Sequence, residues 1–197
     1  MCSLPAVHAQ GADPIVSLQT TRGPIVIRVY RSMVPRTANN FLDLVSRGFY
    51  NGLTFHRWET WCIQGGDPNG NGSGDFIDPQ TGRARYIPLE ISPMLHHNAA
   101  GVVAMARTDN PNSASCQFYI TKSRVPFLDG KYAIFGGVLD GMNVVQSLQR
   151  GDQIISAQII QNGGGGGGMA PQQGFQQQRR GSGTSASNAG TPTDSGF

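Results

Sequence analysis

The stretch LTFHRWETWCIQGGDPNGNGSG, residues 53–74, shows the pattern from which the fold class of this 197-residue chain is predicted. Two short runs rich in apolar and aromatic residues, 53–57 and 61–64, lead directly into a segment of Gly, Asn and Pro. Runs of this length between turn residues are typical of β-strands. The same pattern predicts strands at residues 15–20 and 24–30, which form an opening hairpin, and at 101–106, 117–121, 133–138 and 154–160.

Two helices interrupt this β pattern. Pro35 is suited to a first helical position, and Ala38, Phe41, Leu42 and Val45 repeat at helical spacing. Gly48 then lies where a C-cap glycine is expected. A second, shorter helix is predicted at residues 142–148, before Gly151. We therefore expect a mainly β fold: a closed eight-stranded antiparallel β-barrel capped by two α-helices.

Composition divides the chain into three parts: a flexible leader (1–13), one folded domain (14–161) and a disordered Gly/Gln/Ser-rich tail (162–197). The tail has few apolar residues to bury, so its composition cannot offset the entropy of ordering. The net charge is +3, of which the tail supplies +1 through Arg179, Arg180 and Asp194. A folded part this weakly basic predicts no nucleic-acid partner, although Arg179 and Arg180 beside Gln and Gly leave an RNA-binding tail as an alternative.

The cysteines favour a reducing compartment. Cys2, Cys62 and Cys116 are odd in number and show no metal-binding spacing, which predicts neither a disulfide framework nor a metal site. No run approaches the ~18 apolar residues of a membrane span, so we expect no membrane association. The expected location is cytoplasmic. The start MCSLPAVHAQGADP, which could be the remnant of a removed export signal, leaves the compartment open.

A set of longer motifs carries a resemblance to a family. FHR at 55–57, IQGGDPNGNGSG at 63–74, GVVAMART at 101–108, SCQFYIT at 115–121 and FLDGKYAIFGGVLDGMNVV at 127–145 occur in this order. Over residues 14–161 the chain resembles the cyclophilins, which are peptidyl-prolyl cis–trans isomerases. The resemblance implies a monomer without cofactor or metal that assists protein folding by acting on X–Pro bonds in proline-containing peptides and unfolded proteins.

The chemistry of that reaction indicates a role for Arg57. Rotation about an X–Pro bond has a barrier of ~18–20 kcal/mol because the amide is conjugated. Twisting the bond localises a lone pair on the prolyl nitrogen, and a cation that donates a hydrogen bond there stabilises the twisted state more than either planar state. The guanidinium of Arg57 stays charged and presents several donors in a fixed fork, so we predict that Arg57 is the catalytic residue.

The resemblance also implies the residues that bind substrate. The apolar pocket for the proline ring corresponds to Trp61, Cys62, Ala106, Tyr119, Phe127 and Leu128. The flanking peptide backbone corresponds to Gln64, Arg107 and Gln117, with Tyr132 at the rim. His56 is expected to orient the site rather than to exchange protons, and His96 and His97 are expected to be neither catalytic nor ligands.

Several positions depart from the family pattern. The segment between His56 and Gln64 is one residue shorter than in many relatives and lacks their Pro-Gly pair. Trp61 and Tyr119 replace Phe, and Cys62 replaces Met; the Tyr119 change is expected to add a hydroxyl near the proline ring. Phe127 replaces the Trp of cyclosporin-sensitive relatives. Phe127 has no N–H donor, so we expect weakened cyclosporin affinity.

Two alternatives compete with an isomerase. Residues 67–78, DPNGNGSGDFID, place oxygen side chains at six positions of an EF-hand calcium loop. However, Pro68 and the preceding Gly65-Gly66 argue against an entering helix, so calcium binding is not expected. The second alternative is a binding module that holds a proline-containing partner in the same groove, with the tail recruiting other molecules. The presence of Arg57 favours the enzyme.

Overall fold

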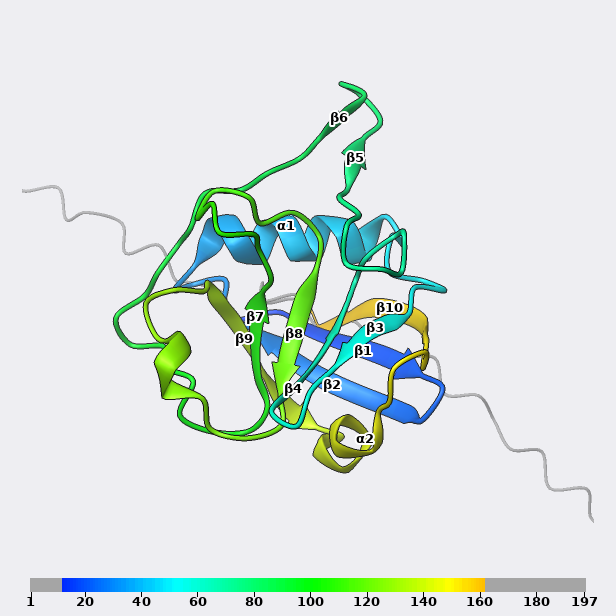
Figure 1. Cartoon of the computed structure of the whole chain (residues 1–197), viewed down its shortest axis with the longest axis vertical. Coiled ribbons are helices and arrows are strands. Elements are labelled where there is room, and N and C mark those ends of the chain that lie inside the picture. Colours follow the sequence, from blue (N-terminus) through cyan, green and yellow to red (C-terminus); the bar gives the residue numbers. More distant parts are fainter. Residues whose placement is uncertain (1–11, 162–197) are drawn as a thin grey trace, which may run out of the picture. The chain divides into compact units, whose positions relative to one another are not determined.

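The computed structural model describes residues 12–161. The predicted tail and nearly all of the predicted leader lie outside the described residues, and those two predictions stay predictions. The described part has a single large sheet with two α-helices (Figure 1).

The sheet contains eight antiparallel strands in the order β10-β1-β2-β9-β7-β8-β4-β3. Their bounds are β1 Ile15–Thr20, β2 Gly23–Val29, β3 Phe55–Trp58, β4 Cys62–Gly65, β7 Val102–Met105, β8 Phe118–Thr121, β9 Ile134–Asp140 and β10 Ile154–Gln161. All eight predicted strands are confirmed, with ends that differ by at most two residues.

The prediction of a closed barrel overstates how far the sheet closes. The two edges of the sheet pair over a short stretch, residues 52–55 against 151–154, through the isolated bridge between Thr54 and Gln153 and backbone bonds such as Gly52 N to Ile154 O at 2.7 Å and Phe55 N to Asp152 O at 2.8 Å. The sheet is therefore curled, and its edges meet over a few residues without a full ladder between β3 and β10. The sequence pattern shows which residues form strands, but it does not show how far the last ladder runs.

Both predicted helices are present. Helix α1, Pro35–Ser46, begins with Pro35 and buries Ala38, Phe41 and Val45 completely or almost completely. Gly48 follows with φ of +67°, a conformation that favours glycine and ends the helix. Helix α2, Met142–Ser147, is one residue shorter than predicted and buries Val144 and Val145.

The buried residues form two groups on opposite faces of the sheet, because side chains alternate along a strand. The main core packs α1 against one face and includes Phe41, Ile63, Phe118, Ile120 and Phe135. A smaller cluster lies on the other face of β4, β7 and β8 and contains Cys62, Ala104, Tyr119, Val125, Leu128 and Ile134. Several of its members are predicted pocket residues, so this outer cluster supports the candidate site.

A small hairpin that was not predicted from the sequence projects from the sheet (Figure 1). It consists of β5, Ile77–Asp78, and β6, Arg83–Ala84. Arg85 fastens its base by donating to Asp43 of α1 at 2.6 Å and to Asp78 at 2.9 Å. Strands of two residues carry too little periodicity to be found in a sequence.

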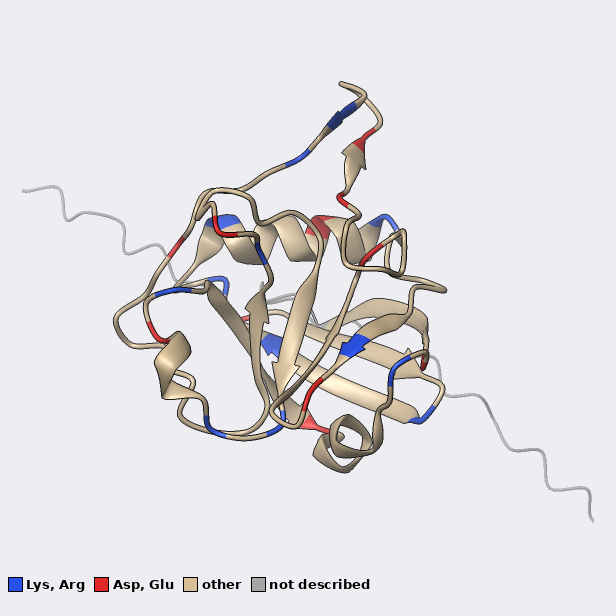
Figure 2. Cartoon of the chain, in the orientation of Figure 1, with Lys and Arg blue, Asp and Glu red and all other residues tan. Residues whose placement is uncertain are grey.

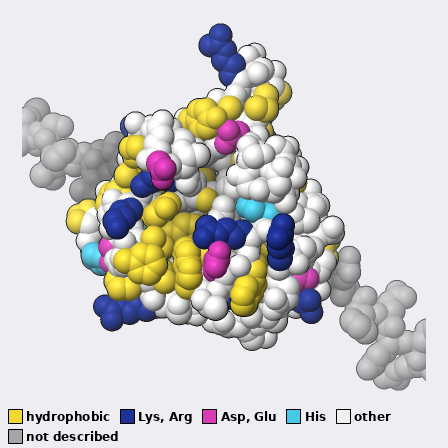
Figure 3. All heavy atoms as spheres, viewed as in Figure 1, with side chains coloured by type: hydrophobic (Ala, Val, Ile, Leu, Met, Phe, Trp, Pro, Cys, Tyr) yellow, Lys and Arg dark blue, Asp and Glu magenta, His cyan; other side chains and the backbone are white. Residues whose placement is uncertain are grey.

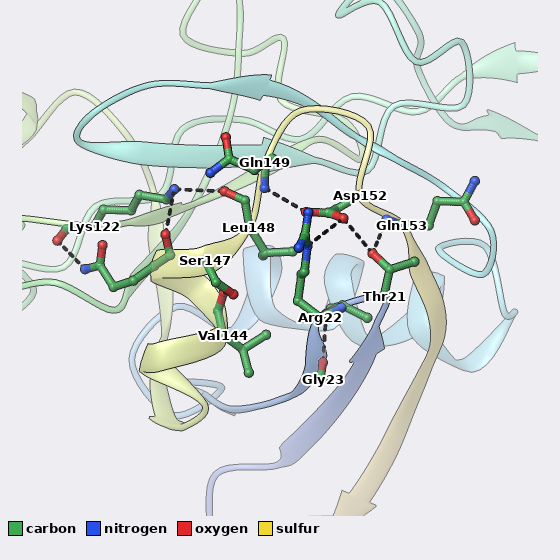
Figure 4. A network of polar contacts seen from close by, with 12 residues as sticks. Thr21, Arg22, Gly23, Lys122, Val144, Ser147, Leu148, Gln149, Asp152 and Gln153 are labelled. Atoms are coloured by element: carbon green, nitrogen blue, oxygen red, sulfur yellow. Dashed lines mark hydrogen bonds and ion pairs between the residues drawn. The ribbon is translucent and has the colours of Figure 1, made fainter.

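The end of α2 is tied to β8 and to the β1–β2 turn (Figure 4). Lys122, directly after β8, donates from Nζ to Leu148 O at 3.1 Å, as suits a cation at a helix C-terminus. Asp152 accepts hydrogen bonds from Arg22 Nε at 2.9 Å, Thr21 Oγ1 at 2.9 Å and Gln149 N at 2.8 Å. The Lys122 bond thus holds the end of β8 against α2, and the Asp152 bonds join the segment after α2 to the β1–β2 turn.

Acidic and basic residues are interspersed along the described chain (Figure 2). Within residues 12–161, no helix combines the length and the apolar character that crossing a membrane requires.

Candidate active site

Four neighbouring strands carry a row of paired residues that includes three predicted site residues, Arg57, Gln64 and Tyr119. The sheet register pairs Arg57 of β3 with Gln64 of β4, Gln64 with Tyr119 of β8, and Tyr119 with Ala104 of β7. Directly paired residues point to the same face of a sheet. The row therefore runs from a cation, through an amide, to the aromatic ring of the outer cluster. On this face, hydrophobic side chains gather beside basic ones (Figure 3).

The Arg57 side chain is half exposed and held at three points. Its Nε donates to Glu59 Oε1 at 3.2 Å, and its Nη1 donates to Gln64 Oε1 at 3.3 Å. The guanidinium carbon lies 5.7 Å from the centre of the Trp61 ring. These contacts hold the charge beside an aromatic wall and leave N–H groups of the fork free to donate outward.

Gln64 and Gln117 continue the line of hydrogen bonds that begins at Arg57, and the donor of each bond can be assigned. Gln64 Nε2 donates to Gln117 Oε1 at 3.0 Å, and Gln117 Nε2 donates to the carbonyls of Gly72 at 3.1 Å and Gly74 at 2.9 Å. Arginine can only donate and carbonyl oxygen can only accept, so both amides are oriented from their two ends. We call Arg57, Gln64, Gln117 and His56 the polar half of the site.

The glycine-rich turn beside Gln117 is held by Asp67. Its carboxylate is almost completely buried and accepts the backbone N–H groups of Asn69 at 2.9 Å, Asn71 at 2.8 Å and Gly72. Burial alone would raise the pKa of Asp67, but these bonds lower it below its ordinary value. A Cβ at Gly74 would collide with this carboxylate. The resemblance to an EF-hand thus comes from an aspartate that organises its own turn.

His56 is buried and lies behind the amides. Its Nε2 is 3.4 Å from Gln64 Nε2, whose second N–H points to it, so His56 Nε2 accepts and the proton lies on Nδ1. Nδ1 has no hydrogen-bond partner among the described residues. Burial lowers the pKa of His56, which keeps the ring neutral at pH 7. These contacts suit a residue that supports Gln64.

Aromatic rings form the other side of the site. Trp61 meets Tyr119 edge-on at a centroid distance of 6.0 Å and Phe127 at 6.3 Å, and Tyr132 meets Tyr119 at 5.9 Å. Such edge-to-face pairs are favourable beyond their buried area. Phe127, on the 3₁₀ helix η1 (Pro126–Leu128), is 61% exposed and forms the rim. We call Trp61, Cys62, Tyr119, Phe127 and Leu128 the apolar half of the site.

Cys62, Tyr119 and Leu128 form the buried part of this half. Burial raises the pKa of the Cys62 thiol to about 12, so it packs as a small neutral side chain. Ala106 packs against the same cluster from the end of β7. The structure thus brings all six predicted pocket residues together.

Arg107 braces its own loop. Its guanidinium donates to the carbonyls of Lys131 at 2.7 Å and Thr108 at 2.7 Å, and it lies 4.7 Å from the centre of the Tyr132 ring. A hollow of about 170 Å³ opens beside it and is also lined by Gln64, Asp75 and Gln117. Most N–H groups of Arg107 are already bonded, so the hollow has a fixed polar wall.

Two residues that contribute to the site, His97 and Asp129, were not predicted as site residues from the sequence. His97 is fully buried between Tyr119 and Asp129, with its Nε2 2.9 Å from the Tyr119 hydroxyl and its Nδ1 2.9 Å from Asp129 Oδ1. The hydroxyl expected near the proline ring is thus bonded to His97. The signal available in the sequence was a histidine pair before a predicted strand, which by itself does not indicate a pocket.

Fold and site together define a protein with a curled antiparallel sheet that carries an aromatic cluster beside a half-exposed guanidinium. Residues 15–181 match the family model of the cyclophilin-type peptidyl-prolyl cis–trans isomerases. The chain belongs to this family.

Individual proteins that are similar to this chain support the same family. A peptidyl-prolyl cis–trans isomerase-like protein of Rhizopus delemar is 44% identical over 68% of this chain and 78% of its own length. An isomerase of Arabidopsis thaliana is 41% identical over 73% of this chain and 85% of its own length. A solved isomerase of Cryptosporidium parvum, studied in the presence of the dipeptide Ala-Pro, matches with a TM-score of 0.67 at 32% identity, over 75% of this chain and 99% of that one.

Proposed function

We propose that this chain catalyses rotation about X–Pro bonds with Arg57 as the catalytic residue. The observation that carries the proposal is the position of its guanidinium, which Glu59 and Gln64 hold beside the Trp61 ring while its remaining N–H groups face outward. Because solvent is partly excluded on the aromatic side, a hydrogen bond to the prolyl nitrogen is stronger there than in water.

The apolar half supplies the pocket for the proline ring. Once Trp61, Tyr119 and Leu128 hold the ring, the residue before proline can turn, and the C–N bond twists toward Arg57. The twisted nitrogen has a lone pair that the planar amide lacks, so the Arg57 hydrogen bond is stronger in the transition state than in either planar state. The reaction breaks no covalent bond and moves no proton.

We also propose that substrates are proline-containing peptides and unfolded proteins, and that the chain acts as a monomer. The relative solved with Ala-Pro supports the substrate class. Phe127 at the rim has no donor, and we propose that cyclosporin binds more weakly here than to relatives with Trp at this position.

The test is turnover of a short Ala-Pro peptide by the full chain and by Arg57→Ala. We expect kcat/KM to fall at least about 10²-fold, or about 2.7 kcal/mol of transition-state stabilisation. Arg83→Ala, on the projecting hairpin, serves as the surface control. Near wild-type turnover in folded Arg57→Ala would contradict the mechanism, and peptide binding without turnover in the wild-type chain would favour the binding module.

A further inference from the structure

The hydroxyl of Tyr119 needs a partner, because Tyr119 is 3% exposed and forms the floor of the proline pocket. A buried phenol without a hydrogen bond is destabilising, because the hydroxyl loses its contact with water and gains no partner. The partner is His97 Nε2 at 2.9 Å, on the loop before β7, and the two rings stack at an interplanar angle of 13°.

The direction of this hydrogen bond follows from Asp129. Its carboxylate accepts the backbone N–H of His97 at 2.6 Å and faces His97 Nδ1 at 2.9 Å. Those bonds lower the pKa of Asp129 although burial opposes them, so the carboxylate is ionised and can only accept. His97 Nδ1 therefore carries the proton, Nε2 of the neutral ring accepts, and the Tyr119 hydroxyl donates.

His97 also joins two walls of the pocket. Its backbone oxygen accepts a bond from Val125 N at 2.9 Å, directly before η1, and Asp129 directly follows η1. Both ends of the turn that presents Phe127 are thus bonded to one buried histidine. The same histidine holds the floor residue on β8. His96, which is half exposed, also approaches Asp129, at 3.4 Å.

We propose that His97 is a positioning residue of the isomerase site: it fastens Tyr119 at the floor of the proline pocket to the Pro126–Asp129 turn that forms its rim. The proposal rests on the proposed use of this pocket for proline. His97 does not touch the reacting bond. Its loss should loosen the pocket and leave the polar half, which has no bond to His97, in place.

The experiment measures KM, kcat and the dissociation constant of an Ala-Pro peptide for the full chain. In His97→Leu the Tyr119 hydroxyl loses its acceptor, so KM and the dissociation constant should rise about tenfold with kcat nearly unchanged. Adding Tyr119→Phe removes the orphan hydroxyl and should restore KM to within about threefold, because removing both polar partners is nearly neutral. His96→Leu is the control and should leave both constants unchanged.

An unchanged KM in folded His97→Leu, or a double variant no better than the single one, would overturn the proposal. If His97→Leu does not fold, the ¹⁵N spectrum of the wild-type chain decides: a protonated Nδ1 and a bare Nε2 support the assignment, and the reverse overturns it. Retained turnover in Arg57→Ala would contradict the catalytic role alone, because the peptide dissociation constants still test His97.

Discussion

The two halves of the site are held in different ways. In the polar half, Arg57, Gln64 and Gln117 form a line of directed hydrogen bonds that ends on the carbonyls of Gly72 and Gly74. In the apolar half, Trp61, Tyr119 and Phe127 meet edge-on without a directed bond between them. Removing one donor or acceptor from a line of hydrogen bonds leaves its partners unpaired. Packed rings, by contrast, tolerate replacement of a side chain by another of similar volume.

The largest difference in activity between the two halves should appear when one residue of each half is replaced by methionine. Gln64→Met keeps length and flexibility but removes the acceptor of Arg57 and the donor to Gln117. We expect kcat/KM to fall about 10- to 100-fold, since buried polar partners are left unpaired. Leu128→Met conserves volume and should cost less than about 1.5 kcal/mol of stability and little activity. Equal losses in peptide turnover for the two variants would contradict the distinction.

Cyclosporin tests the rim of the apolar half. Phe127→Trp adds an indole N–H at a position that is already 61% exposed and needs no repacking of the core. A recovered hydrogen bond should strengthen inhibition about 5- to 150-fold, the equivalent of about 1–3 kcal/mol. Phe127→Tyr is the control, because it keeps the ring but places its donor differently. Inhibition constants that do not change in Phe127→Trp would show that Phe127 does not face the drug.

The smallest effect on stability concerns two buried histidines, His56 in the polar half and His97 beside the apolar half. Burial lowers the pKa of both His56 and His97, so the folded chain resists protonating them. The unfolded chain binds these protons below about pH 6.5, so this contribution to stability is full above that pH and is lost as the pH falls below it. Each histidine should contribute less than about 1.4 kcal/mol per unit of pH.

Urea unfolding at pH 7.5 and 5.5 measures this loss. His97→Asn and His56→Asn should each reduce the difference in the free energy of unfolding between pH 7.5 and pH 5.5. We expect the larger reduction for His97, which is fully buried, than for His56, which is 8% exposed. Two variants that keep the full wild-type pH dependence would show that other groups cause it.

Much of the fold could be predicted because it depends on local patterns. The helical spacing of Ala38, Phe41 and Val45 gave α1, and the eight apolar runs gave the strands. The chemistry of the reaction indicated Arg57, and the family motifs between residues 55 and 145 implied six pocket residues, which the structure places close together. The β5–β6 hairpin was missed because two-residue strands have no measurable period, and the closure of the sheet was overstated because ladder length is not a local property.

The strands, the two helices, the family and the residue types of the site follow from the amino-acid pattern. The contacts between individual atoms depend on the three-dimensional fold. Tyr119 lies 22 residues from His97, and His97 lies 32 residues from Asp129, so their bonds depend on the register of β8 and the course of two loops. The direction of a hydrogen bond between distant residues has no periodic signal in a sequence. It exists only once the sheet has brought donor and acceptor to the same face.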